Sequence, residues 1–177
     1  AGIVDSDGDG YRELDGKNID INIVATTSRQ QDVIAQAYAV QLEGIGIKST
    51  ISMPENVVDL RVSQGFDMIF NNEVTTPTGD PENFLKHWYG QITDTSFNYG
   101  NYHNDEYDAL YEQLIGEFDT EKRKEIFTQM QEILMEDVAT ICSGAYNFNI
   151  CSADSVQGVH SYVCDYYWVT KDVTPTL

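Results

Sequence analysis

The stretch that decides the fold is residues 19–53, IDINIVATTSRQQDVIAQAYAVQLEGIGIKSTISM. From Ile19 to Ala25, apolar side chains fall at every second position, which is the pattern of a strand with one buried face. Residues 33–42 then carry apolar side chains three and four apart, as in an amphipathic helix, and Gly44 supplies a residue suited to ending it. Ile47 to Met53 predict a second strand, so the stretch reads strand, helix, strand.

The same alternation continues beyond this stretch. Val57 to Leu60 predict a short helix that ends near Gly65, and Met68 to Phe70 predict a third strand. Such alternation favours parallel strands joined by right-handed crossovers, with ligands collecting at the carboxyl ends of the strands. We therefore expect an α/β fold with a mixed, largely parallel sheet flanked by helices.

Three helix starts carry residues that satisfy free backbone N–H groups. Ser28 and Gln31 predict a capping box, and Asp80-Pro81-Glu82 are expected at the N-cap, first and second positions of a helix. Asn104 is expected to cap a third helix that Gly116 ends. The clearest helix begins near Asp119 or Thr120 and runs to Val138, after which Ala139 to Leu177 are expected to form strands and loops.

The bulk composition limits the classes of protein to which the chain can belong. It has 177 residues, 10 Lys+Arg against 29 Asp+Glu, a net charge of −19 and a pI near 4.1. Nucleic acid would be repelled, and a strongly acidic surface favours a soluble monomer. One globular unit is expected from the length. The chain shows no membrane-spanning run and no leader at Ala1, so we expect a piece of a longer, exported protein.

Three cysteines, Cys142, Cys151 and Cys164, lie late in the chain without the CxxC spacing of zinc or redox sites. Two interpretations stay open, namely three buried thiols that act as small hydrophobes, or one disulfide and a spare thiol. The sequence also lacks the motifs of nucleophilic and nucleotide chemistry. We therefore expect no enzyme and no required cofactor, although a carboxylate pair of a secreted hydrolase stays an alternative.

An Asp- and Gly-rich loop near the start has the spacing of a calcium site. Its oxygen ligands would come from Asp5, Asp7, Asp9, the carbonyl of Tyr11, and Glu13. Position 12 of an EF-hand loop is Gly16 here, where a bidentate Glu is needed, so a shorter loop on a hairpin fits better. The loop predicts either a Ca²⁺ site or an Asp/Gly-rich turn without metal.

Two polar loops follow predicted elements and are the candidate ligand-binding segments. The first covers residues 71–80, and the second runs from Gly90 to His103 and is rich in tyrosines that can stack and hydrogen-bond. His103 lies within the aromatic part of that loop, whereas His87 and His160 are expected to be ordinary histidines. The candidate ligand-binding residues are Asn71, Asn72, Glu73, Thr75, Thr78, Asp80, Tyr99, Tyr102 and His103.

Several motifs in order resemble those of the family 5 extracellular solute-binding proteins. They are Ala1-Gly2 with Asp5 to Gly10, Leu42 to Ile47, Gly65 to Met68, Asp80 to Leu85, Asn104 to Leu110, and Arg123 to Asp137. The resemblance covers roughly Ala1 to Gly158. It implies one lobe of a type II periplasmic-binding-protein-like fold, with residues 1–177 forming the C-terminal lobe region and 159–177 belonging to the crossover to the other lobe.

The resemblance also implies a function and partners. Members of the family serve ABC importers, capture a peptide, a nickel complex or another small solute, and deliver it to a membrane permease. It implies an extracellular or periplasmic location with a membrane tether in the full-length protein. Where peptide-binding members carry a Trp and an Asp that hold the peptide's amino terminus, this chain has Val74 and Pro77. The alternative is a calcium-binding extracellular interaction module.

Overall fold

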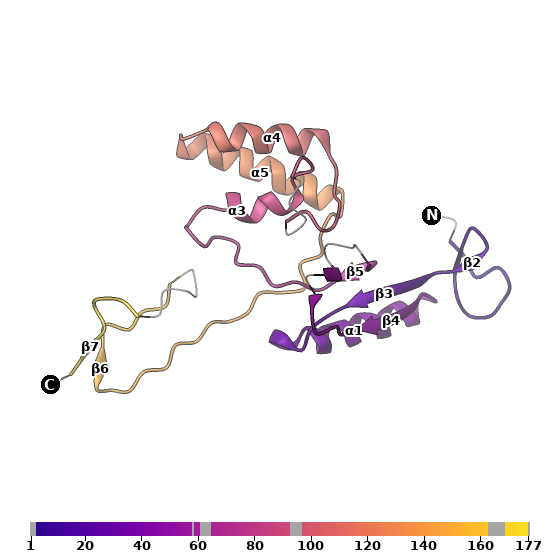
Figure 1. Cartoon of the computed structure of the whole chain (residues 1–177), viewed down its shortest axis with the longest axis horizontal. Coiled ribbons are helices and arrows are strands. Elements are labelled where there is room, and N and C mark those ends of the chain that lie inside the picture. The colour runs from indigo at the N-terminus through magenta and orange to yellow at the C-terminus, as the bar shows by residue number, and fades with distance from the viewer. Residues whose placement is uncertain (1–2, 58, 61–64, 93–96, 163–168, 177) are drawn as a thin grey trace. The chain divides into compact units, whose positions relative to one another are not determined.

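A computed structural model describes residues 3–57, 59–60, 65–92, 97–162 and 169–176 (Figure 1). The chain divides into two compact units, Ala1–Asn72 and Glu73–Leu177. The expected assignment of residues 1–177 to one lobe stays a prediction. Within the described residues, no helix has both the length and the apolar character needed to cross a membrane.

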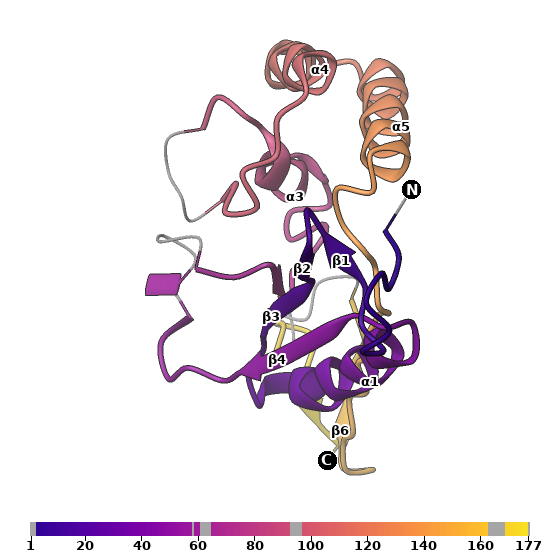
Figure 2. The ribbon, with the colours of Figure 1, turned by 90° about the vertical axis from the view of Figure 1, so that its right-hand side faces the viewer.

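The first unit contains the predicted parallel sheet. β3 (Asp20–Val24) lies in the centre, between β4 (Lys48–Ser52) and β5 (Met68–Ile69), and pairs in parallel with both. α1 (Gln31–Gly44) connects β3 to β4 and packs beside the sheet (Figure 2). Its apolar face and the alternating side chains of β3 form one core, made of Ile23, Ala25 and Ala35 with Ile21, Ala39, Leu42, Ile51, Met68 and Phe70 around them. The α/β prediction is confirmed.

The predicted capping box at the start of α1 is wrong. Arg29 and Gln30 have positive φ angles of 51° and 61°, and no side chain caps the helix, which begins at Gln31. The Gln31 side chain instead accepts hydrogen bonds from the Thr26 backbone N–H at 3.1 Å and the Thr26 hydroxyl at 2.8 Å. Gln31 is buried, so its amide oxygen needs a partner. It bonds to Thr26, just after β3, and not to the free N–H groups at the start of the helix.

The Asp-rich loop ends in a small antiparallel hairpin of the first unit. It pairs β1 (Glu13–Leu14) with β2 (Lys17–Asn18). The sequence analysis favoured such a hairpin over the two helices of an EF-hand. The Arg12 guanidinium donates to the carbonyls of Ile45 at 2.6 Å and Ile3 at 3.0 Å, which ties the loop to the carboxyl end of α1.

The second unit is built from helices. α3 (Glu82–Leu85) continues into a 3₁₀ turn, η2 (Lys86–Trp88), and is followed by α4 (Asp105–Gly116) and α5 (Thr120–Glu136). Asn104 caps α4 through its side chain, as predicted, and the Asp119 side chain caps α5, which was expected to begin near Asp119 or Thr120. The start of α3 differs by one residue, because the Asp80 carboxylate accepts from the Glu82 N–H while Pro81 stands before the helix.

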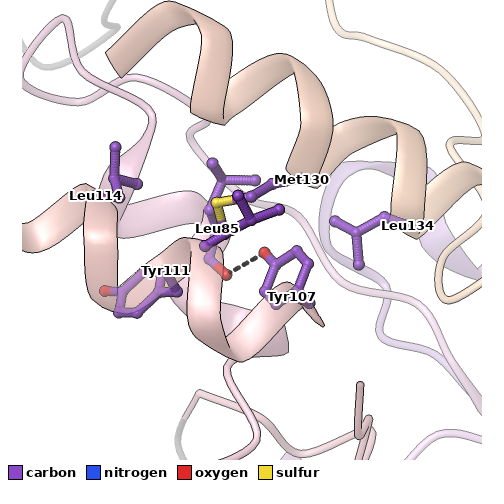
Figure 3. Packing of buried hydrophobic residues seen from close by; sticks show 7 residues of the cluster. Leu85, Tyr107, Tyr111, Leu114, Met130 and Leu134 are labelled. Atoms are coloured by element: carbon purple, nitrogen blue, oxygen red, sulfur yellow. Dashed lines mark hydrogen bonds between the residues drawn. The ribbon is translucent and has the colours of Figure 1, made fainter. Parts of the chain in front are cut away.

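The core of this unit lies where α3, α4 and α5 meet (Figure 3). It consists of Leu85, Tyr107, Leu110, Tyr111, Leu114, Met130 and Leu134. Tyr107 is fully buried, and its hydroxyl donates to the Leu85 carbonyl at 2.6 Å, so the polar end of this ring is satisfied inside the core. Burial raises the pKa of Tyr111 to about 12.

One arginine joins the polar ends of the same helices. Arg123 of α5 donates to Asp80 at 2.8 and 3.2 Å and to Glu82 at 2.9 Å, both at the start of α3. It also donates to the Leu114 and Glu117 carbonyls at 2.7 and 2.8 Å, where α4 ends. A planar guanidinium with five donors suits this arrangement of four acceptor groups.

The remainder of the second unit has little regular structure. Among its described residues, β6 (Val156–Gln157) and β7 (Thr174–Pro175) pair antiparallel and are the strands found after α5. Cys142 and Cys151 are exposed free thiols, so the interpretation of three buried thiols, one of the two left open by the sequence, is wrong for these two. Cys164 lies outside the described residues.

Replacing Arg123 tests how far this one side chain stabilises the second unit. For Arg123→Ala we expect the free energy of unfolding to fall by about 2 kcal/mol, because hydrogen-bonded carboxylates and carbonyls lose their donor. A fully buried pair would cost more, but Asp80 and Glu82 are each 39% exposed. Urea unfolding followed by helical circular dichroism measures the change. The neighbouring, exposed Lys124→Ala is the matched control, and an equal effect of both variants would contradict the interpretation.

Candidate functional site

The two predicted ligand-binding loops meet at His87 within the second unit. From the first loop, Glu73 places its Oε1 3.4 Å from Nε2 of His87. From the second loop, the rings of Phe97 and Tyr99 lie 5.4 and 6.3 Å from the imidazole, centroid to centroid. His87 stands on η2 between these loops, so one imidazole contacts side chains from both.

The surroundings of His87 define its orientation and charge. Its Nδ1 lies 2.9 Å from the Phe84 carbonyl, which only accepts, so Nδ1 carries a proton and Nε2 faces Glu73. The side chain is 11% exposed. Burial lowers its pKa, but the hydrogen bond to Glu73, the Phe84 carbonyl and the Glu73 charge outweigh burial, so the pKa is raised. His87 was expected to be an ordinary histidine, and no spacing in the sequence connects it to Glu73.

The second loop is held at its start by a buried carboxylate. Asp108 of α4 accepts from the Gly90 N–H at 2.8 Å and from the Gln91 side chain at 2.9 Å. A Cβ on Gly90 would lie 2.8 Å from Nδ1 of His103 and 2.9 Å from Oδ2 of Asp108, so a larger residue there would have to displace these side chains. Sequence reasoning missed Asp108, because it reads as one of three acidic residues in the first turn of a helix.

Besides Glu73 and Tyr99, the predicted ligand-binding residues Asp80 and Tyr102 also have partners within the second unit. Asp80 binds Arg123 and accepts a hydrogen bond from the Glu82 N–H, as described above. The hydroxyl of Tyr102 donates to Asp137, and burial together with that carboxylate raises the pKa of Tyr102. Both side chains therefore position loop ends, whereas Thr75, Thr78 and His103 are exposed. Asn71 and Asn72 are half-buried at the end of the first unit.

The Asp-rich loop of the first unit brings four carboxylates together. One oxygen from each of Asp5, Asp7, Asp9 and Glu13 lies within 4.8 Å of the others. Backbone N–H groups already bind them: Asp5 accepts from Gly8 and Gly10, Asp9 from Tyr11, and Glu13 from Ser6. These bonds alone can shape a turn, while carboxylates at this separation also suit a hard divalent cation. The Ca²⁺ site, with the Tyr11 carbonyl as a ligand, stays a prediction.

A cavity of about 410 Å³ lies beside this loop, between it and the end of α1. Its lining consists of Val4, Asp5, Gly10, Arg12, Gly44, Ile45 and Gly46. The guanidinium of Arg12 is occupied by two carbonyls, so the cavity offers one carboxylate and backbone groups. It is thus separate from the cluster of side chains at His87, which belongs to the second unit.

Comparison with solved structures identifies the kind of protein that shares this fold. A periplasmic oligopeptide-binding protein of an ABC transporter from Thermotoga maritima, solved with bound mannohexaose, is 28% identical with a TM-score of 0.68. The nickel ABC transporter protein from Bacillus halodurans is 21% identical with a TM-score of 0.66. The oligopeptide-binding protein AppA from Bacillus subtilis, in complex with a nonapeptide, is 22% identical with a TM-score of 0.66. No family model and no curated protein matches the sequence.

These matches cover 73–78% of this chain but only 27–28% of the matched chains. The structural neighbours are binding proteins of nickel and peptide ABC transporters, and the resemblance inferred from the sequence motifs is confirmed at the level of the fold. The chain spans about a quarter of the length of each neighbour. Their ligands and partners are therefore properties of much longer proteins.

The pH dependence of stability tests the contact between His87 and Glu73. Because the folded pKa of His87 is raised, its contribution is fully present below the unfolded value of about 6.5 and is lost as the pH rises through the folded pKa. The stability difference between the native chain and His87→Gln should therefore shrink from pH 5.5 to pH 8. Urea unfolding at each pH measures it. The exposed His160→Gln is the control, and a difference that grows with pH would contradict the assignment.

Calcium binding by the Asp-rich loop is tested by titration calorimetry. We expect heat of Ca²⁺ binding from the native chain and weaker binding in Asp5→Asn, because this change keeps an oxygen ligand but removes one of the negative charges that hold the cation. Asp15→Asn, which changes a nearby acidic residue outside the cluster, should leave binding unchanged. Absence of heat at millimolar Ca²⁺ would leave the loop as a turn stabilised by its own hydrogen bonds.

Proposed function

We propose that this chain is a ligand-capturing part of the solute-binding component of an ABC importer. It would bind a small solute, such as a peptide or a nickel complex, and present it to a membrane permease. The observation that carries the proposal is the fold shared with peptide- and nickel-transporter binding proteins over 73–78% of the chain. The contact of both polar loops with His87 supports it, because ligand sites form where loops from a rigid scaffold converge.

The proposal extends to the location and assembly of the protein. Neighbours with this fold include periplasmic oligopeptide-binding proteins, which supports an extracellular or periplasmic location for this chain. In the full-length protein a tether would hold it at the membrane near the permease. It would act as a monomer, in keeping with its net charge of −19, and as the C-terminal lobe region of a two-lobe protein without catalysis.

The choice among solutes depends on the first loop. If the residues that hold a peptide's amino terminus in peptide-binding members correspond to Val74 and Pro77, this chain lacks that anchor. A free ammonium group taken from water needs a carboxylate partner to offset its desolvation. The carboxylate of Glu73 in the same loop is in contact with His87. An ordinary free peptide is therefore disfavoured relative to other solutes.

A second candidate function, a calcium-binding extracellular interaction module, rests on one observation. Four carboxylate oxygens of the Asp-rich loop lie within 4.8 Å of one another. In that case Ca²⁺ would stabilise the first unit, and raising its concentration would raise the thermal unfolding temperature. A solute-binding part needs no such dependence, so thermal unfolding with and without Ca²⁺ separates the two functions.

The affinity of the isolated chain tests the interpretation as one part of a two-lobe site. Closure of two lobes around a solute supplies contacts from both sides, and one lobe alone forfeits those of the other. We expect dissociation constants weaker than micromolar for oligopeptides, nickel–histidine complexes and oligosaccharides, as measured by NMR titration of the chain. A submicromolar dissociation constant would contradict the one-lobe interpretation. Mass spectrometry of solutes that co-purify with the longer protein would then identify the ligand class.

A further inference from the structure

The second polar loop is closed by a side chain that does not titrate. Asn98 donates to the carbonyls of Tyr102 at 2.9 Å and Tyr89 at 3.4 Å, and it accepts from the Tyr102 N–H at 3.0 Å. It therefore joins residues at both ends of the loop. Because a side-chain amide carries no ionisable proton near neutral pH, this brace is the same in acid and in mild alkali.

The first polar loop is held by two contacts between opposite charges. Near its end, Asp80 accepts two hydrogen bonds from Arg123, whose guanidinium is always charged. Near its start, Glu73 is the first residue of the second unit and lies 3.4 Å from Nε2 of His87. Since a histidine gains or loses its proton near neutral pH, the contact at Glu73 is the one that a pH change in this range can break.

The hydrogen bond at Nδ1 determines what happens when His87 loses its proton. The Phe84 carbonyl, 2.9 Å from Nδ1, only accepts, so the proton leaves from Nε2. Nε2 then presents a lone pair to the Glu73 carboxylate, and two acceptors face each other. The His87 side chain is 11% exposed, so little water can screen this repulsion, whereas the Glu73 side chain is 33% exposed and has solvent to turn to.

The other described groups around the imidazole include one further charge. They are the rings of Phe84, Trp88, Phe97 and Tyr99, the last with a phenol, and the neighbouring ammonium of Lys86, which lies 4.0 Å from the Phe97 centroid. Although burial lowers the pKa of His87, the Glu73 carboxylate and the Phe84 carbonyl raise it overall. The contact is thus present below pH 6.5 or so and is lost as the pH rises through the folded pKa.

We propose that Glu73 and His87 form a pH-dependent latch for the first polar loop. Protonated His87 holds the start of the loop beside η2, and neutral His87 releases it, while the Asn98 brace keeps the second loop closed. The latch acts on loops to which the proposed function assigns the solute. Weaker solute capture at alkaline pH is therefore a consequence that rests on that function, whereas the latch itself does not.

NMR of the whole chain between pH 5.5 and pH 8.5 tests the latch without any ligand. The ring signals of His87 give its midpoint, which we expect above 6.5. The heteronuclear ¹H–¹⁵N nuclear Overhauser effect reports picosecond-to-nanosecond motion of the backbone. For residues 73–76 it should fall as the pH passes the His87 midpoint, because the loop start is released. For residues 98–102 it should stay constant.

Two variants separate the latch from a general effect of pH. Glu73→Gln removes the charge, so the His87 midpoint should fall by roughly one pH unit and the motion of residues 73–76 should no longer change at it. His160→Gln removes an exposed histidine and should alter neither. Circular dichroism shows whether each variant is folded, and the native chain decides alone if one is not. Equal motion of residues 73–76 on both sides of the midpoint, or an equal change in Glu73→Gln, overturns the latch and leaves the proposed function standing.

Discussion

The arrangement of the second unit depends on the guanidinium of Arg123. It is the one side chain described there that binds the start of α3 and the end of α4 from a position on α5. Hydrophobic packing around Leu85 and Tyr107 brings these helices together, but packing of apolar side chains is not directional. The hydrogen bonds of Arg123 are directional, and they fix residue 80, where the first polar loop joins α3.

The second polar loop is fixed by different groups with the same physical logic. Asp108, buried on α4, binds the backbone of Gly90 at one end of the loop, and Asp137 accepts from Tyr102 and Asn104 at the other. Asp108 is buried, and a buried carboxylate without such donors would be costly, whereas Asp137 is exposed and its bonds contribute less. Between these ends, Phe97 and Tyr99 are half-buried beside His87. Loops whose ends are fixed by a rigid scaffold are what recognition of a solute requires.

The sequence predicts the fold better than it predicts the site. Strands, helices and the cap at Asn104 follow from local periodicity and from a side chain that reaches N–H groups two or three residues away. The capping box at Ser28 failed because Gln31 found a partner in Thr26, a competition that spacing alone does not reveal. The contact of Glu73 with His87 depends on how a loop folds back across α3, and no local pattern encodes it.

The same difference explains why Asp80 and Tyr102 were predicted as ligand-binding residues. A polar residue in a loop after a predicted strand looks the same in sequence whether it faces a solute or a helix end. The neighbouring elements decide, because Arg123 and Asp137 lie 43 and 35 residues further along the chain. Once these side chains bind their helix partners, the charges of the described loop residues are balanced inside the chain. Most of the net charge of −19 then lies outside these loops, where it repels anions and does not oppose the approach of a neutral solute.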